Sequence, residues 1–427
     1  MTTSREMTTG PALPLILNFT LPLLLGNLLQ QTYSLVDAAI VGQFLGIDAL
    51  AGVGASSSVI FLILGFCNGC CCGFGIPVAQ RFGAHDYADM RRYVANALRL
   101  AVGISVTVAI VTSIWCADIL HAMRTPDNIF RDAYLYLLVT FIGIPCTFFY
   151  NLLSNIIRAL GDSRTPFYFL VFSSVTNVIL DYFMVRPWGI AGVAWATFIA
   201  QGAACLLTLF AVFLRLKKIK TEEKPKIFSG ALLKMLLLLA LPVALQNSFV
   251  SVGNLIVQVK INGYGDAVMA GFTAGSKLMI FCTTCFCTCA NGLTNFVSQN
   301  YGAHEFTRIK RGFYAELVIS TLLVAAFFAA VFSFAEPLVK LFLSEEEDTA
   351  KTLEAGVQFV RIVSPFFFAV NVKVSADAAV RGSGGNAGFM VSTFTDLLLR
   401  VAGRSRLTPT ALLNNANVSW QTEGEDL

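Results

Sequence analysis

Long uncharged stretches dominate the pattern of hydrophobic and polar positions along the chain. A helix needs about 20 mostly apolar residues to cross the hydrocarbon core of a bilayer, so such stretches can be counted as predicted spans. Ten of them qualify, and an eleventh begins near Gly388 and stops at Ala402. The ten cover residues 13–36, 50–79, 94–115, 133–157, 165–185, 189–214, 229–259, 267–298, 312–334 and 353–372. The pattern predicts an all-α polytopic membrane protein.

Composition supports the same class. The 427 residues are 56% hydrophobic and only 13% charged, whereas about 25% of residues are charged in soluble domains. The N-terminal sequence MTTSREMTTG is too polar for the apolar region of a cleaved signal peptide, so we expect the first stretch to remain as a span. The net charge of +4 comes from basic residues spread over several loops without interleaved aromatic residues. We therefore expect membrane lipids around the protein and no nucleic-acid partner.

Loop charges predict the orientation of the chain. Loops that follow the even-numbered predicted spans hold most of the arginines and lysines, including the segment RLKKIKTEEKPK at residues 215–226. Loops on the other side are poor in basic residues and include the acidic run at residues 345–348. By the positive-inside rule, the even-numbered loops and the N-terminus are cytoplasmic. The sequence predicts a multi-pass protein of the inner or plasma membrane.

Two pairs of similar sequence segments reveal an internal repeat. QRFGAHDYADMRR at residues 80–92 returns as QNYGAHEFTRIKR at residues 299–311, and LPLLLGN at residues 21–27 returns as LPVALQN at residues 241–247. Six predicted spans separate the copies, an even number, so both halves keep the same orientation. This arrangement is a parallel repeat, related by an axis along the membrane normal.

The repeat and the central charged linker divide the chain into four predicted parts. These are an N-terminal lobe at residues 1–214, a cytoplasmic linker at residues 215–228, a C-terminal lobe at residues 229–402 and a polar tail at residues 403–427.

Three motifs carry a resemblance to a known family. YSLVDAAIVGQFLG in the first span, AQRFGAHD after the second and IIRALGDSRTP after the fourth resemble the bacterial multidrug and toxic compound extrusion (MATE) transporters. The resemblance covers residues 10 to about 402 and implies two six-helix lobes around a central cavity. It also implies export of small hydrophobic, often cationic compounds in exchange for sodium ions or protons. We expect such a transporter to act as a monomer.

The end of the sequence departs from that family. The resemblance implies a full eleventh and twelfth span, but after Ala402 the polar tail contains no apolar run of about 20 residues. We interpret this as a truncation or frameshift that leaves the second lobe incomplete, strands Asp396 and Arg400 on a short helix, and impairs transport. The alternative is an ordinary cytoplasmic tail.

Polar residues inside the spans are candidates for function, because a charge within a membrane is expensive and usually faces a cavity. Asp37 is the only acid of the first span, and Asn177 and Asp181 lie four residues apart on the fifth. With Thr197 of the sixth span, they offer oxygen ligands at similar depth toward the outer side of the first lobe. Such ligands suit a sodium ion, and a carboxylate can take up a proton.

The alternative is that Asp37 and Asp181 merely mark the outer ends of their helices. The resemblance favours an ion-coupling site, because similar MATE proteins carry a cation-binding acid in span one and an Asn and Asp at this spacing in span five. Val257 stands where the second half would repeat Asp37, so we expect coupling only in the first lobe.

Other polar residues of the same helices are candidates for a substrate cavity, namely Gln30, Gln31, Tyr33, Asn151 and Asn155. The two asparagines could equally bond to a neighbouring helix, because amides commonly join membrane helices.

Enzyme chemistry is not expected. The clusters CNGCCC at residues 67–72 and CTTCFCTC at residues 282–289 lie in predicted spans without nearby histidines, so packing is favoured over a metal site. No catalytic nucleophile with a base and no nucleotide motif stands out, and we predict no metal and no organic cofactor. Two further functions stay open, a flippase for a lipid-linked precursor and a remnant that no longer transports.

Overall fold

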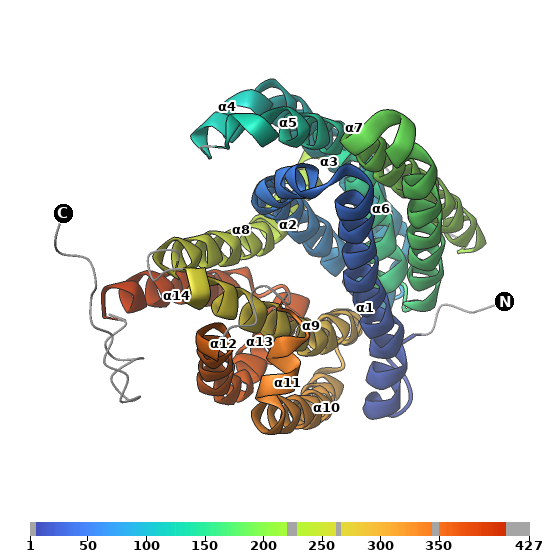
Figure 1. The fold of residues 1–427 in the computed structure, drawn as a ribbon. Coiled ribbons are helices and arrows are strands. Elements are labelled where there is room, and N and C mark those ends of the chain that lie inside the picture. Colours follow the sequence, from blue (N-terminus) through green and yellow to red (C-terminus); the bar gives the residue numbers. More distant parts are fainter. Residues whose placement is uncertain (1–5, 124, 220–228, 262–265, 344–349, 407–427) are drawn as a thin grey trace, which may run out of the picture.

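The computed structural model describes residues 6–123, 125–219, 229–261, 266–343 and 350–406, which form a helical bundle (Figure 1). No strand occurs among these residues. The helices are α1 (Ala12–Leu45), α2 (Ile47–Gly83), α3 (Tyr87–Ile114), α4 (Cys116–Ala122), α5 (Asp127–Ile142), α6 (Ile144–Ala159), α7 (Arg164–Lys218), α8 (Gly230–Ile261), α9 (Asp266–Gly302), α10 (Phe306–Ser333), α11 (Ala335–Lys340), α12 (Ala350–Val363), α13 (Phe367–Ser383) and α14 (Asn386–Arg406), with a 3₁₀ turn at Ser364–Phe366.

The helices account for the predicted spans. Within the described residues, eight helices are long and apolar enough to cross a membrane, or nine if α5 and α6, bent by 47°, form one span. α7 has 55 residues with a non-helical Gly189 inside it (φ 58°). A helix of that length would extend about 80 Å, more than twice the hydrocarbon thickness, so α7 contributes two spans. The ten predicted spans are therefore present, and α14 contains the shorter apolar stretch Ala387–Leu398.

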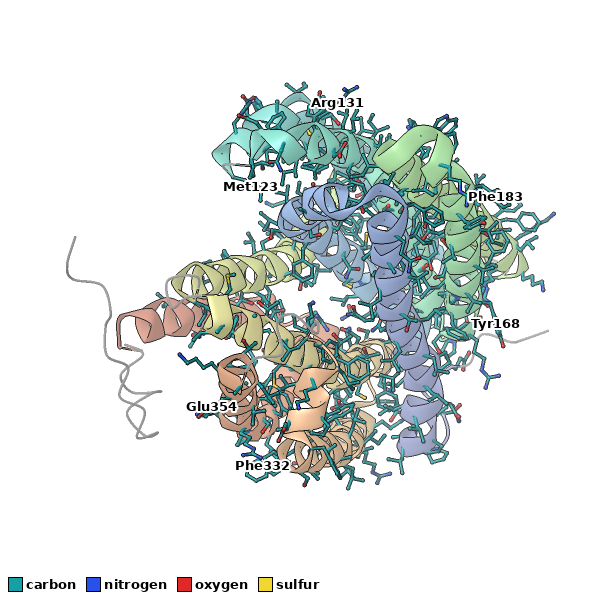
Figure 2. All side chains as sticks on the ribbon, in the orientation of Figure 1. Met123, Arg131, Tyr168, Phe183, Phe332 and Glu354 are labelled. Carbon is teal, nitrogen blue, oxygen red and sulfur yellow. The ribbon has the colours of Figure 1, made fainter. Side chains whose placement is uncertain are left out.

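Large apolar side chains project outward from the bundle, as expected for a surface that faces lipid. Figure 2 shows Tyr168, Phe183 and Phe332 on the outside of their helices, and these side chains are 63%, 67% and 49% exposed. In water such a surface would be unfavourable, whereas in a bilayer it contacts hydrocarbon.

The two halves of the chain form two groups of helices, α1–α7 and α8–α14 (Figure 1). Irregular backbone occurs at equivalent places in both. His85 and His304 have φ values of 56° and 59°, and Gly161 and Gly384 have φ values of 82° and 79°. The GAH phrases are thus tight turns with the same left-handed residue, which supports the parallel repeat. The exact domain bounds remain predictions; α7 continues to Lys218 and α14 to Arg406, and the rest of the predicted tail lies outside the described residues.

Close packing of α2 against α8 joins the two lobes. Gly69 and Gly73 of α2 face Ala244 and Ala240 of α8, and neither glycine has room for a Cβ atom. Small residues four apart on facing membrane helices allow this approach and maximise van der Waals contact.

The lobes also meet at the end of the bundle that carries the GAH turns, here called the GAH end. Gln80 Nε2 donates a hydrogen bond of 3.0 Å to the Gly382 carbonyl. In the repeated position, Gln299 Nε2 donates one of 2.8 Å to the Ala159 carbonyl. The two glutamines thus bond reciprocally to the opposite lobe and close this end.

A buried ion pair fixes the start of α7 at the GAH end. Asp162 accepts hydrogen bonds from the backbone N–H of Arg164 at 2.8 Å and from the hydroxyl of Thr165 at 2.6 Å, and it forms an ion pair with Arg215. Burial alone would raise the pKa of Asp162, but the hydrogen bonds from Thr165 and Arg215 outweigh burial and lower it below its usual value. The folded protein therefore favours the ionised carboxylate.

We expect Asp162→Asn to lower the free energy of unfolding by about 1.5–3 kcal/mol at neutral pH, the usual range for hydrogen bonds to charged groups. A lowered pKa stabilises the folded state fully above the unfolded pKa, about 3.9 for Asp, and the contribution disappears as pH falls through the folded pKa. Thermal unfolding of both proteins in detergent should show a gap that closes below about pH 4. Asp127→Asn, at an exposed position, is the control, and an equal loss there would contradict the assignment.

Candidate functional site in the first lobe

Two carboxyl groups lie next to each other between α1 and α7, in the half of the first lobe away from the GAH end. Asp37 of α1 and Asp181 of α7 are close enough to hydrogen-bond when one of them is protonated. Asp181 is fully buried, and both of its oxygens, like Oδ1 of Asp37, have no hydrogen-bond donor among the described residues. Two adjacent buried carboxylates repel each other unless a proton or a cation lies between them.

The other two predicted ion-coupling residues lie on α7. Asn177 Nδ2 donates a hydrogen bond of 3.2 Å to Thr197 Oγ1, and Thr197 Oγ1 donates one of 3.2 Å to the Val193 carbonyl. The reversal at Gly189 brings Thr197 back beside Asn177. Asn177 Oδ1 is buried and accepts no hydrogen bond from the part of the chain that the structure describes, so it offers an acceptor one helical turn from Asp181. The structure thus brings the four predicted residues together.

Tyrosines surround this acidic pair. Tyr33 of α1 lies near Asp37, and Tyr136 of α5 lies near both carboxyl groups. Tyr136 was not among the predicted site residues, because it sits in an apolar stretch with no local signal. Phenol hydroxyls can donate to a carboxylate or accept from a bound group. We therefore include Tyr136 in the candidate site.

A polar cavity of about 70 Å³ lies between α1, α6 and α7 on the side of the acidic pair nearer the GAH end. Gln30 and Asn151 line it, as predicted. Gln31, Tyr33 and Asn155 are not part of its lining, and Asn155 Nδ2 instead donates to the Asn151 carbonyl at 3.0 Å. Two of the five predicted cavity residues therefore reach the cavity.

Two charged residues outside the predicted site lie among the helices, Arg158 partly buried and Glu316 fully buried. Arg158 ends α6 and lines the cavity. Glu316 of α10 is fully buried beside Ser320 and Ser375, and neither of its carboxylate oxygens accepts a hydrogen bond of good geometry from the described residues. Glu316 is the only acid in the predicted span 312–334, a signal that could have identified it.

Two aspartates of the second lobe, Asp377 and Asp396, are paired with a lysine. Asp377 forms an ion pair of 2.9 Å with Lys373, one helical turn before it on α13, and accepts a hydrogen bond of 2.7 Å from Ser392. Asp396 lies 3.8 Å from Lys373, so the expectation that Asp396 is stranded was wrong. The side chains of Arg400 and Val257 lie outside the described residues.

The cysteines are free and mostly buried. Cys71 Sγ lies 3.5 Å from the Phe148 carbonyl and donates to it, and the surrounding residues form the apolar core of the first lobe. In the described part of the chain, no group of three or more His, Cys, Asp or Glu side chains could hold a metal ion.

Two helical lobes related by a repeat, with polar groups at the membrane interior, are the architecture of a secondary transporter. A family model described as MatE matches residues 22–183 and again residues 242–403. The chain is 31% identical over 382 residues to a protein named probable multidrug resistance protein YpnP from Bacillus subtilis, covering 89% of this chain and 84% of the relative.

A protein named probable multidrug resistance protein NorM from Thermotoga maritima is 23% identical over 395 residues, covering 90% of this chain and 82% of that protein. A solved structure described as the outward-facing conformation of a multidrug resistance MATE family transporter superposes with a TM-score of 0.85, at 21% identity, over 93% of this chain and 89% of the other. The chain belongs to the MATE family and is a multi-pass plasma membrane transporter for small molecules. The double family match confirms the internal repeat.

Proposed function

We propose that this protein exports hydrophobic, often cationic compounds in exchange for protons or sodium ions, with the coupling ion bound by Asp37, Asn177, Asp181 and Thr197. The observation that carries the proposal is the acidic pair, whose buried oxygens lie close together and receive no hydrogen bond from the described residues. The multidrug resistance names of the relatives support the substrate class.

The chemistry of the pair explains how ion and substrate could exchange. A proton shared between Asp37 and Asp181 removes their repulsion, and so does a sodium ion bound by carboxylate, amide and hydroxyl oxygens. A cationic substrate in the adjoining cavity would do the same, so substrate and coupling ion compete for one negative site. Binding either one changes the relative stability of the conformations open to the two sides of the membrane.

The closed GAH end supports an outward-open state in this mechanism. Hydrogen bonds from Gln80 and Gln299 hold the lobes together there. The positive-inside prediction makes this end cytoplasmic, because arginines and lysines concentrate in its loops. Alternating access then requires those contacts to break when the coupling ion or the substrate binds.

Transport in reconstituted vesicles tests the proposal. We expect efflux of a cationic dye to depend on an imposed proton or sodium gradient and to stop when an ionophore collapses that gradient. Vesicles without protein are the control. Movement of a lipid-linked precursor without dye efflux would favour the flippase alternative, and absence of both activities would favour a remnant that no longer transports.

A further inference from the structure

We propose that Arg158 forms an oxyanion-binding subsite in the first-lobe cavity, for the carboxylate or phosphate of a small amphipathic molecule. The inference rests on the proposed transport function, because it assigns part of the same cavity. It adds an anion-binding group to a site whose other charges are acidic.

Arg158 has no anionic partner in the described part of the chain. Its Nε is buried without an acceptor, and its guanidinium takes part in no ion pair there. The nearest acid in sequence is Asp162, which is already paired with Arg215 and accepts from Thr165. No acidic residue lines the cavity. The guanidinium, partly buried with its Nε fully buried, therefore lacks the counter-charge that usually accompanies an arginine inside a protein.

The guanidinium of Arg158 is not needed to bond the last carbonyls of α6. A basic residue in the last turn can bond to the terminal carbonyls of a helix. At the end of α6, however, the Ile157 carbonyl accepts from the backbone N–H of Asp162 at 3.3 Å, and the Ala159 carbonyl accepts from Gln299 at 2.8 Å. The Arg158 carbonyl itself accepts from Gly161 at 2.9 Å. The terminal carbonyls are therefore satisfied by other groups, and the guanidinium remains available.

The other residues of the cavity suit a ligand that is polar at one end and apolar at the other. Amides and hydroxyls accompany the guanidinium, and apolar side chains form the rest of the wall. The polar group includes Asn27, Gln30, Tyr150, Asn151, Ser163 and Gln201. Leu23, Phe167 and Leu170 are among the apolar residues. A volume of about 70 Å³, open to the centres of water-sized spheres, is enough for a carboxylate or phosphate group, since about 10–15 Å³ on this measure already holds one water molecule.

Arginine recognises such groups by geometry as well as by charge. Its planar guanidinium can donate two parallel hydrogen bonds to the two oxygens of a carboxylate or phosphate. The cavity adjoins the acidic pair through Tyr150 and Tyr33, which lie near each other. A zwitterionic molecule can therefore place its anionic group at Arg158 and its cationic group toward Asp37. Purely cationic compounds would use only the acidic end.

A matched pair of dyes tests this subsite by binding alone. One probe is a zwitterionic xanthene dye with a free carboxylate, and the other is its methyl ester, which carries only the positive charge. Fluorescence polarisation with the purified protein in detergent measures the affinity for each. Arg158→Gln should weaken binding of the carboxylate dye about tenfold or more, the usual effect of losing a charged hydrogen bond. Binding of the ester should change less than about twofold.

Two further variants separate recognition from folding. Arg158→Lys keeps the charge but loses the paired donors, so we expect an intermediate loss for the carboxylate dye and none for the ester. Arg164→Gln is the matched control, because Arg164 is exposed in the same α6–α7 turn. Equal weakening of both dyes in Arg158→Gln, or no weakening of the carboxylate dye, would overturn the proposal.

Separate measurements identify the source of the anion and test the proposed transport function. Displacement of the carboxylate dye by phosphatidylglycerol, but not by phosphatidylcholine with the same chains, identifies a lipid headgroup as the occupant. Absence of displacement by either lipid identifies a soluble molecule. If the dyes bind selectively but no gradient drives their efflux, the subsite stands and the export function fails. If both dyes are exported and Arg158→Gln weakens the binding of both dyes equally or of neither, the subsite proposal is rejected and the export function remains supported.

Discussion

Asp37→Asn is expected to reduce gradient-driven dye efflux to the level of vesicles without protein, while the protein still inserts and folds. The substitution keeps the size of the side chain but removes the charge that a proton or sodium ion neutralises. It also removes the repulsion between Asp37 and Asp181, so the site no longer needs the coupling ion. Efflux under an imposed proton or sodium gradient, with thermal unfolding measured in parallel, checks both parts of this expectation.

Comparison with Asp181 makes the test specific to the pair. Asp181→Asn should have the same effect, and the double variant should be no worse than either single one, because residues that act as a unit are not additive. Asp127→Asn, at an exposed position of α5, should transport normally. Unchanged efflux by Asp37→Asn would show that this acid does not couple ion movement to export.

Much of the fold could be predicted because membrane helices follow one simple physical rule. Backbone groups in hydrocarbon must be hydrogen-bonded internally, so long apolar stretches become helices. This rule located the spans, and the repeated GAH phrases revealed the two related halves. The candidate ion site also emerged from local pattern, since Asn177 and Asp181 share a helix face by spacing. Thr197 joins them only through the reversal at Gly189, whose geometry the sequence pattern does not give.

Residue positions around a helix were harder to predict. α1 is apolar around most of its circumference, so its sequence does not show which face meets the other helices. Gln30 and Gln31 therefore looked equivalent, yet only Gln30 lines the cavity. Consecutive residues point about 100° apart on a helix, which is enough to separate them.

Buried charges were missed for a related reason. Arg158 lies just outside the predicted span 133–157 and therefore counted as a loop residue, but α6 extends to Ala159 and carries this side chain into the lobe. Glu316 was overlooked because the predicted span 312–334 is strongly apolar on average, and one acidic residue changes that average little. In both cases burial is determined by helices distant in sequence, and local hydropathy does not contain that information.

The glycines at the GAH end provide a second large expected effect. Gly83 packs against the backbone of Gln299, and Gly302 packs against the backbone of Gln80. A Cβ atom at Gly302 would lie 2.6 Å from the Gln80 carbonyl carbon, and one at Gly83 would lie 2.6 Å from the Gln299 carbonyl carbon. Real Cβ atoms do not approach backbone so closely, so the lobes would have to separate there.

Gly302→Ala is therefore expected to disfavour the conformation closed at the GAH end and to slow transport. Overpacking typically costs about 1–3 kcal/mol, which corresponds to a shift of roughly 5- to 150-fold in the conformational equilibrium. Hydrogen–deuterium exchange should rise in peptides that contain residues 76–90 and 295–310, where the lobes meet. Gly83→Ala should act in the same way, because the two contacts are reciprocal.

Gly103→Ala is the control, since nothing lies within 4 Å of a Cβ atom there and alanine favours a helix. Normal transport and exchange in Gly302→Ala would show that this end of the protein does not need to close during the cycle.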